Sequence, residues 1–336
     1  MSFVSYGDLA STFQTRHLTA QIKQDMARLG LELSTGRKAG LATQVSGDFG
    51  PVAGIEHSLK LQSAYDQSIA EATTVLAGAQ TVLGAVQNQA EAVSGDLILA
   101  VSSRNGGLLH ATAVDARERM ASVISNLNTS LGGRALFAGT ASDGPALAGA
   151  DAILSEVMIA IAGETTAAGI SDRIDDWFTT PGDGFDTMAY QGADQDLGPF
   201  RLRDGEIASQ PFRADSTEIR DLLAALAKSA VLAEGALAGD FDAQRALVKR
   251  SSGNLLDAMD GLTGARAYIG RIEARIEAAA ASNAAEKAAL ELSYNRLTAA
   301  DPYETATALQ ALYDQMESLY TVTARLSSLN FTDYMR

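Results

Sequence analysis

Residues 65–100 read YDQSIAEATTVLAGAQTVLGAVQNQAEAVSGDLILA and contain the longest regular pattern in the chain. Apolar residues recur there in two series with a spacing of seven, the second displaced by four from the first. The first series is Tyr65, Ala72, Ala79, Val86, Val93 and Ala100, and the second is Ile69, Leu76, Leu83, Ala90 and Leu97. These are the a and d positions of a heptad repeat. They predict a helix over about 55–103, roughly 70 Å long, whose apolar seam needs other long helices beside it.

Amphipathic helices are also predicted at both ends of the chain. An apolar stripe with spacings of three and four lies within about 8–35, and Gly36 follows as a stop signal. A second stripe follows Pro302, a residue suited to a helix start, and extends nearly to the last residue. The first stripe consists of Leu18, Ile22, Met26, Leu29 and Leu33, and the second of Leu309, Leu312, Met316, Leu319, Leu326 and Leu329.

Two more helical segments accompany the long repeat. One is predicted over about 110–131, after a break at Asn105-Gly106-Gly107. The other covers 240–297 and repeats every seven residues, with Asn283 in the place of one apolar residue. Helix resumes near Ser216, so both halves of the chain are dominated by helices.

The central region differs in composition. Gly and Asp are frequent over 135–215, four prolines interrupt it, and the heptads stop. A short helix over 152–161 and one or two strands within 200–214, turning at Asp204-Gly205, are predicted there. We expect a small mixed insert.

These patterns predict a mainly α protein. The N- and C-terminal halves would form a long antiparallel helical bundle or coiled coil, with a small mixed α/β central insert. Three parts are expected: terminal helices as an inner assembly domain, a long-helix rod, and the insert. Their ranges are 1–54 plus 298–336, 55–134 plus 216–297, and 135–215.

Composition narrows the class of function. The net charge of −15 argues against nucleic acid and anionic membranes as partners, because phosphate binding needs clustered Lys and Arg. No apolar run approaches the roughly 18–20 residues of a membrane span, and residues 1–20 lack the pattern of a cleavable secretory signal. The absence of cysteine excludes disulfides and thiolate chemistry.

Catalytic and metal chemistry find little support. His17, His57 and His110 are far apart and lack the spacing of a metal site. The acidic pair Asp175-Asp176 is interpreted as solvated surface, and Gly132-Gly133 lacks phosphate-binding spacing. We therefore predict no catalytic residue, no metal and no cofactor, and expect that the protein is not an enzyme.

The two terminal stripes predict self-assembly. An isolated helix is marginal in water, so each stripe needs a partner. The terminal helices can cover one another, but two helices leave part of their seams open, and other copies of the chain would cover the rest. The eleven stripe residues are therefore the predicted assembly interface, with terminal segments that order on assembly. A plain intramolecular bundle explains the periodicity equally well.

Four stretches resemble bacterial flagellins or flagellar hook-associated proteins. Residues 31–38, LELSTGRK, are similar to a turn of these families, and residues 300–330 resemble their last helix. Residues 128–140, NTSLGGRALFAGT, are similar to an element of the hook-associated protein of the hook–filament junction, where flagellins usually differ. Tyr190-Gln191-Gly192 also resembles that family. The family's Asp-Asp-Pro type loop is not matched; its nearest counterpart is Gly47-Asp48-Phe49-Gly50-Pro51.

The resemblance implies a structural role at the flagellum, outside the cell. Such proteins are exported without a cleaved signal, and a chaperone is expected to hold the C-terminal helix until export. The implied partners are copies of the chain, another hook-associated protein on the hook side and flagellin on the filament side. The alternatives are a flagellin and, from another class, a cytoplasmic coiled-coil adaptor that binds partner helices. A hydrolase built on the central insert has the least support.

Overall fold

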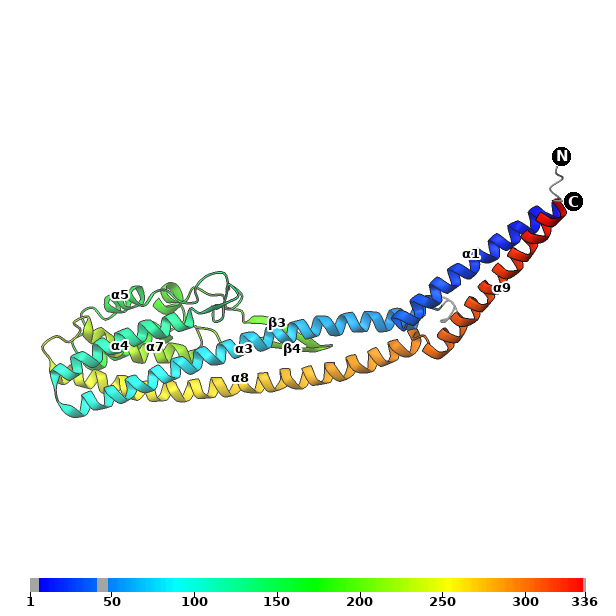
Figure 1. The fold of residues 1–336 in the computed structure, drawn as a ribbon. Coiled ribbons are helices and arrows are strands. Elements are labelled where there is room, and N and C mark those ends of the chain that lie inside the picture. Colours follow the sequence, from blue (N-terminus) through cyan, green and yellow to red (C-terminus); the bar gives the residue numbers. More distant parts are fainter. Residues whose placement is uncertain (1–5, 41–47, 335–336) are drawn as a thin grey trace. The chain divides into compact units, whose positions relative to one another are not determined.

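The computed structural model describes the backbone of residues 6–40 and 48–334 and is mainly helical (Figure 1). The side chains of residues 6–9, 11, 12 and 326–334 lie outside the description. The chain forms two compact units, Met1–Leu61 with Ala285–Arg336, and Gln62–Ala284. The predicted terminal domain, 1–54 with 298–336, falls within the first unit, and its assignment as an assembly domain stays a prediction. The division of the second unit into a rod and an insert stays a prediction.

In the first unit, α1 (Tyr6–Thr35) and α9 (Pro302–Tyr334) lie side by side (Figure 1). Gly36 ends α1 in a left-handed conformation with φ +67, and its N–H donates to the carbonyl of Glu32 at 2.8 Å. This is the glycine C-cap that the sequence predicted. At its start, α9 is capped by Asp301, whose carboxylate accepts hydrogen bonds from two N–H groups of the first turn.

The loop predicted over 39–54 is shorter than expected. The helix α3 (Gly50–Ser103) already begins at Gly50, because Pro51 occupies its first turn, where a missing N–H has no cost. Residues 41–47 of that prediction lie outside the described residues.

The second unit is built on the predicted heptad repeat. All eleven of its a and d residues are buried, and nine of them belong to the core of this unit. Here α3 runs beside α8 (Phe241–Thr298), as Figure 1 shows, and the amide of Gln80 donates to the carbonyl of Arg266 at 2.7 Å. Arg266 in turn donates to the Gln87 amide oxygen at 2.7 Å. The mainly α fold is confirmed.

A tight connection joins α3 to α4 (Gly106–Leu127). The side-chain oxygen of Asn105 accepts hydrogen bonds from the N–H groups of Gly107 and Leu108, at 2.9 and 3.2 Å. Asn105 is therefore the N-cap of α4 as well as part of the predicted break. Next in the core, α7 (Thr217–Ala233) is buried over an unbroken run of residues 222–232.

The central region contains the predicted short helix and hairpin. The helix is α5 (Ala150–Ala160), and β3 (Leu197–Arg203) pairs antiparallel with β4 (Glu206–Gln210) around the Asp204-Gly205 turn. A second, two-residue hairpin joins β1 (Ser130–Leu131) to β2 (Arg134–Ala135) through Gly132 and Gly133, both with positive φ.

A further helix of this region was not predicted. The helix α6 (Ala167–Thr179), followed by the π-helical turn η1 (Phe185–Ala189), brings Trp177, Phe178 and Phe185 together. The rings of Trp177 and Phe178 are 4.7 Å apart in an edge-on arrangement. The core of the central region is therefore packed with large aromatic rings, whereas the helical seams are packed with small aliphatic residues.

One prediction about apolar runs is wrong. Within α3 an 18-residue stretch has a mean hydropathy of 1.3, so the helix is long and apolar enough to cross a membrane by length and composition alone. Its apolar residues are the seam residues of the heptad repeat, and they are buried within the protein. The high hydropathy of this stretch follows from an alanine- and valine-rich seam.

Candidate assembly surface

The two predicted stripes form the seam between α1 and α9. Ile22, Leu29 and Met316 are buried there. Four more stripe residues are half-buried, namely Met26, Leu309, Leu312 and Leu319. Leu18 and Leu33 are exposed, while the side chains of Leu326 and Leu329 lie outside the described residues. Most of the described stripe residues thus pack within one chain, and their role between copies stays a prediction.

Large apolar side chains lie exposed around this seam. We call them the terminal surface: Phe13, Leu18, Leu31, Leu33, Tyr303, Tyr313, Tyr320 and Val322. Tyr303 is 83% exposed and Phe13 is 73% exposed, although both belong to helices. Several exposed apolar residues on one pair of helices are typical of a surface that other protein covers. Six of them are not among the predicted stripe residues, although the spacing of seven between Tyr313 and Tyr320 is a usable signal.

The turn after α1 is fastened to the junction between α8 and α9. The N–H of Lys38 donates to the carbonyl of Thr298, and the N–H of Ala300 donates to the carbonyl of Gly36, both at 3.0 Å. Arg37 lies between them and places its guanidinium 5.3 Å from the centre of the Tyr294 ring. The LELSTGRK stretch therefore has a structural role: it connects the end of α1 to the junction between α8 and α9.

Tyr294 extends this fastening to the first turns of α3. Its hydroxyl donates to a carboxylate oxygen of Glu56 at 3.0 Å, and this hydrogen bond raises the pKa of Tyr294. The pair is exposed, so its contribution to stability is small. It connects α3 to α8 within the first unit.

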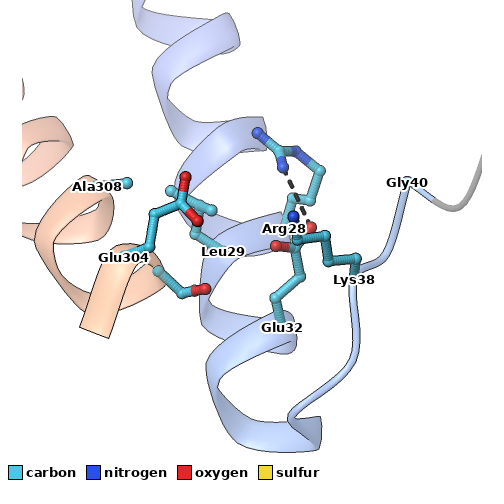
Figure 2. A pocket seen from close by; sticks show the side chains of 8 residues that line it. Arg28, Leu29, Glu32, Lys38, Gly40, Glu304 and Ala308 are labelled. Atoms are coloured by element: carbon cyan, nitrogen blue, oxygen red, sulfur yellow. Dashed lines mark hydrogen bonds and ion pairs between the residues drawn. The ribbon is translucent and has the colours of Figure 1, made fainter. Parts of the chain in front are cut away.

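A pocket of about 480 Å³ lies between this turn and α9 (Figure 2). Figure 2 shows Arg28, Leu29 and Glu32 entering from α1, Lys38 from the turn, and Glu304 from α9. The remaining lining residues are Gly40, Thr305 and Ala308.

The negative charge of Glu32 is compensated by neighbouring groups of the pocket. Its buried carboxylate accepts hydrogen bonds from the N–H of Ala39 and from the guanidinium of Arg28, both at 3.1 Å. A hydrogen bond to Asp25 and the Glu32 contact raise the pKa of Arg28. Within residues 6–40 and 48–334, no group of three His, Asp or Glu side chains is placed to hold a metal.

The 128–140 element has a different task in the second unit. Phe137 and Ala138 are fully buried, and their carbonyls accept hydrogen bonds from the N–H groups of Ala214 and Ala193, both at 2.9 Å. Gly139 follows with φ +60, and a Cβ atom there would lie 2.2 Å from the carbonyl oxygen of Gln195. Only glycine fits this position, which gives a physical reason for the glycine in residues 136–140, LFAGT.

The Tyr190-Gln191-Gly192 stretch completes the same network. The Tyr190 hydroxyl donates to the carbonyl of Ala193 at 2.8 Å, and burial, with the nearby charge of Asp215, raises the pKa of Tyr190 to about 12. Arg213 forms ion pairs with Asp196 at 2.6 Å and with Asp215 at 2.9 Å. The two stretches that resembled the junction protein therefore contact one another.

The C-terminal end of the chain is similar to a known protein family. Residues 253–335 match the family model of the bacterial flagellin C-terminal helical region. The C-terminal part of the chain is therefore similar to that of flagellins. The matched residues include α8 from residue 253 onward and the described part of α9, and hence one wall of the α1–α9 seam.

Solved structures match the fold of the chain. The crystal structure of Bacillus cereus FlgL matches with a TM-score of 0.50 and 18% identity, covering 70% of this chain and 96% of that one. A putative flagellar hook-associated protein from Vibrio parahaemolyticus matches with a TM-score of 0.50 and 15% identity, covering 73% and 95%. No curated protein matches the sequence. The resemblance to flagellar hook-associated proteins is confirmed for the fold.

Proposed function

We propose that this protein is a structural component of the bacterial flagellum that joins hook to filament as a hook-associated protein and supports flagellin assembly. One observation carries the proposal. A flagellin-type C-terminal region lies within a chain whose fold matches FlgL over 96% of the length of that protein. The 128–140 element favours the junction protein over the filament subunit.

The terminal surface supports an assembling subunit over a self-contained bundle. The seam residues of α1 and α9 already pack on each other, yet Tyr303, Tyr313 and Phe13 remain more than half exposed on the same helices. Burying such side chains is favourable by about 1.5–3 kcal/mol each. Identical subunits in a helical array can bury them through heterologous contacts, in which different faces of neighbours meet.

The proposed partners follow from this position. Copies of the chain surround each subunit, another hook-associated protein lies on the hook side, and flagellin lies on the filament side. The protein works outside the cell, is exported without a cleaved signal, and has α9 held by a chaperone before export. No catalytic activity is part of this function.

A flagellin, the filament subunit itself, is the second candidate. The match of residues 253–335 to a flagellin family model favours it, because that model carries the flagellin name. A cytoplasmic coiled-coil adaptor is the third candidate and rests on the heptad repeat alone.

Gold labelling of the protein on intact cells, viewed by electron microscopy, separates these functions. A single band between hook and filament is expected. Label along the whole filament would identify a flagellin. Absence of label from every flagellum would remove both flagellar functions and leave the intracellular adaptor.

A second experiment addresses assembly in solution. Brief protease treatment of the purified protein is expected to trim both chain ends and to leave the second unit, residues 62–284, intact. The reason is that α1 and α9 are each covered on one side only. Equal resistance of both ends and the second unit would contradict terminal segments that order on assembly.

A further inference from the structure

A second cavity lies along the seam of the first unit and carries positive charge. It has a volume of about 370 Å³ between α1 and α9. We call it the basic groove; its lining is Thr15, Arg16, Thr19, Ala20 and Lys23 on α1, and Leu319, Tyr320 and Thr323 on α9. None of these residues is acidic. Neither Arg16 nor Lys23 forms a salt bridge with any residue in the described part of the chain.

The two cations are positioned by helix geometry. Arg16 and Lys23 are seven residues apart, so they lie on the same side of α1, two turns from one another. Both are exposed. Leu319 and Tyr320 add an apolar wall opposite them. A groove with a cationic edge and an apolar wall fits a helix whose surface combines carboxylates with an apolar or aromatic side chain.

The chain itself presents such a helix surface. Asp314 and Glu317 are three residues apart on α9 and exposed, and Tyr313, 52% exposed, adjoins them. We call these three residues the acidic ridge. Among the described residues neither carboxylate takes part in a salt bridge, although Asp314 accepts a hydrogen bond from the Gln310 amide at 3.0 Å.

Geometry keeps Asp314 away from the groove of its own chain. Met316 marks the side of α9 that is buried against α1. At about 100° per residue, Asp314 is turned roughly 160° from Met316 and therefore faces outward. The carboxylate that complements the groove is available to another molecule.

We propose that the basic groove of one copy receives the acidic ridge of a second copy. This inference rests on the proposed function, because it specifies how subunits contact one another. Groove and ridge are different faces, so the contact is heterologous and repeats from copy to copy. Exposed charge pairs add little affinity but select orientation, while Tyr313 against Leu319 and Tyr320 supplies apolar contact.

A charge-swap mixing experiment tests the inference. Arg16→Glu/Lys23→Glu and Asp314→Lys/Glu317→Lys are each expected to weaken self-association of the full chain at least about tenfold in sedimentation equilibrium, because like charges then meet. A 1:1 mixture of the two variants is expected to return to within about threefold of the wild type, since alternating copies pair opposite charges. A mixture no better than either variant alone would overturn the proposal.

Matched controls reverse charges elsewhere in the same unit. Lys60→Glu/Arg296→Glu and Glu286→Lys/Glu291→Lys change the net charge equally at exposed positions and should leave self-association unchanged. Because the chain has no cysteine, Thr19→Cys/Gln310→Cys provides a second readout. Oxidation should give covalent chains of copies on a denaturing gel, and purely monomeric product would count against the contact.

The two proposals fail in different ways. Gold label at the junction combined with failed charge-swap rescue would leave the function intact and show that other faces meet. Rescue in solution combined with no label on flagella would keep the contact and remove the flagellar role.

Discussion

The side chain of Asn128 pairs with the backbone of Leu147, donating to its carbonyl at 2.9 Å and accepting from its N–H at 2.8 Å. Asn128 lies at the C-cap of α4, and Leu147 forms a β-bridge with Tyr190. One amide thus connects the end of a core helix to the central region. The asparagine of the 128–140 element is a fastening residue within the fold.

Asn128→Ala should lower the free energy of unfolding by about 2–3 kcal/mol, because both backbone groups of Leu147 lose their partner. Urea denaturation monitored by circular dichroism measures the effect. Asn126→Ala, two residues earlier and without a described side-chain hydrogen bond, is the control and should change stability by less than about 0.5 kcal/mol. Equal effects of the two variants would refute the fastening role.

Gly139→Ala should destabilise the protein by about 2–5 kcal/mol. The new Cβ would lie 2.2 Å from the Gln195 carbonyl oxygen, and φ is +60. Gly144→Ala is the matched control, because no atom lies within 4 Å of its added Cβ. A melting temperature of Gly139→Ala equal to that of the control would be inconsistent with the structure.

The ammonium group of Lys228 is fully buried and contacts Asp175 at 2.7 Å. Asp175→Asn should cost about 2–4 kcal/mol, because it leaves a buried charge without its counter-ion, whereas Lys228→Met should cost less than about 1–2 kcal/mol. Chemical denaturation of both variants, with exposed Asp172→Asn as control, measures the difference. The order of the two costs is the test: a larger loss for Lys228→Met would contradict it.

Burial, followed by the charges of Asp175 and Glu218, raises the pKa of Asp221 above its ordinary value of 3.8. The folded state therefore binds this proton more tightly than the unfolded state, so stability falls as the pH rises through and above 3.8. Asp221→Asn should consequently be more stable than the wild type at pH 7. Its advantage should vanish at pH 3, where both states of the wild type are protonated.

Thermal unfolding at both pH values measures this difference. Asp257→Asn, which removes an exposed carboxylate on α8, is the control with which the effect of Asp221→Asn is compared. A stabilisation by Asp221→Asn that is the same at pH 3 and pH 7 would argue against the titration of Asp221 as its cause.

The helical architecture was predictable because it rests on repetition. Ala72, Leu76 and Ala79 recur at helical spacing with polar residues between them, and a one-sided pattern of this kind identifies both the helix and its buried face. The two strands around Asp204-Gly205 were predictable for a similar reason, since their turn residues are distinctive.

Other elements gave no such signal. The helix α7 was expected near Ser216, but its buried face was not predictable, because Leu222, Leu226 and Lys228 are all buried and no polar side marks this part of the helix. The helix α6 has four turns at most, and Trp177 packs against Phe185 beyond its end. Contacts between distant segments decide these elements, and a local pattern cannot show them.

The residues of the α1–α9 seam were predictable for the same reason, while their role between copies stays a prediction. Periodicity identified Ile22, Leu29 and Met316, which are the residues that α1 and α9 use on each other. Tyr303 and Phe13 stand outside the stripes, so only the structure shows that they remain exposed. A pattern in one chain reveals which residues need cover, but not which molecule supplies it.

The first unit is assembled from segments at opposite ends of the described chain, whereas the second unit is one continuous stretch. During synthesis at about 5–20 residues per second, α1 would wait on the order of tens of seconds before its partner α9 is made. Throughout that interval Ile22 and Leu29 have no seam to enter, while residues 62–284 can already fold. The order of synthesis thus delays the pairing of α1 with α9, and with it the folding of the first unit, until α9 has been made.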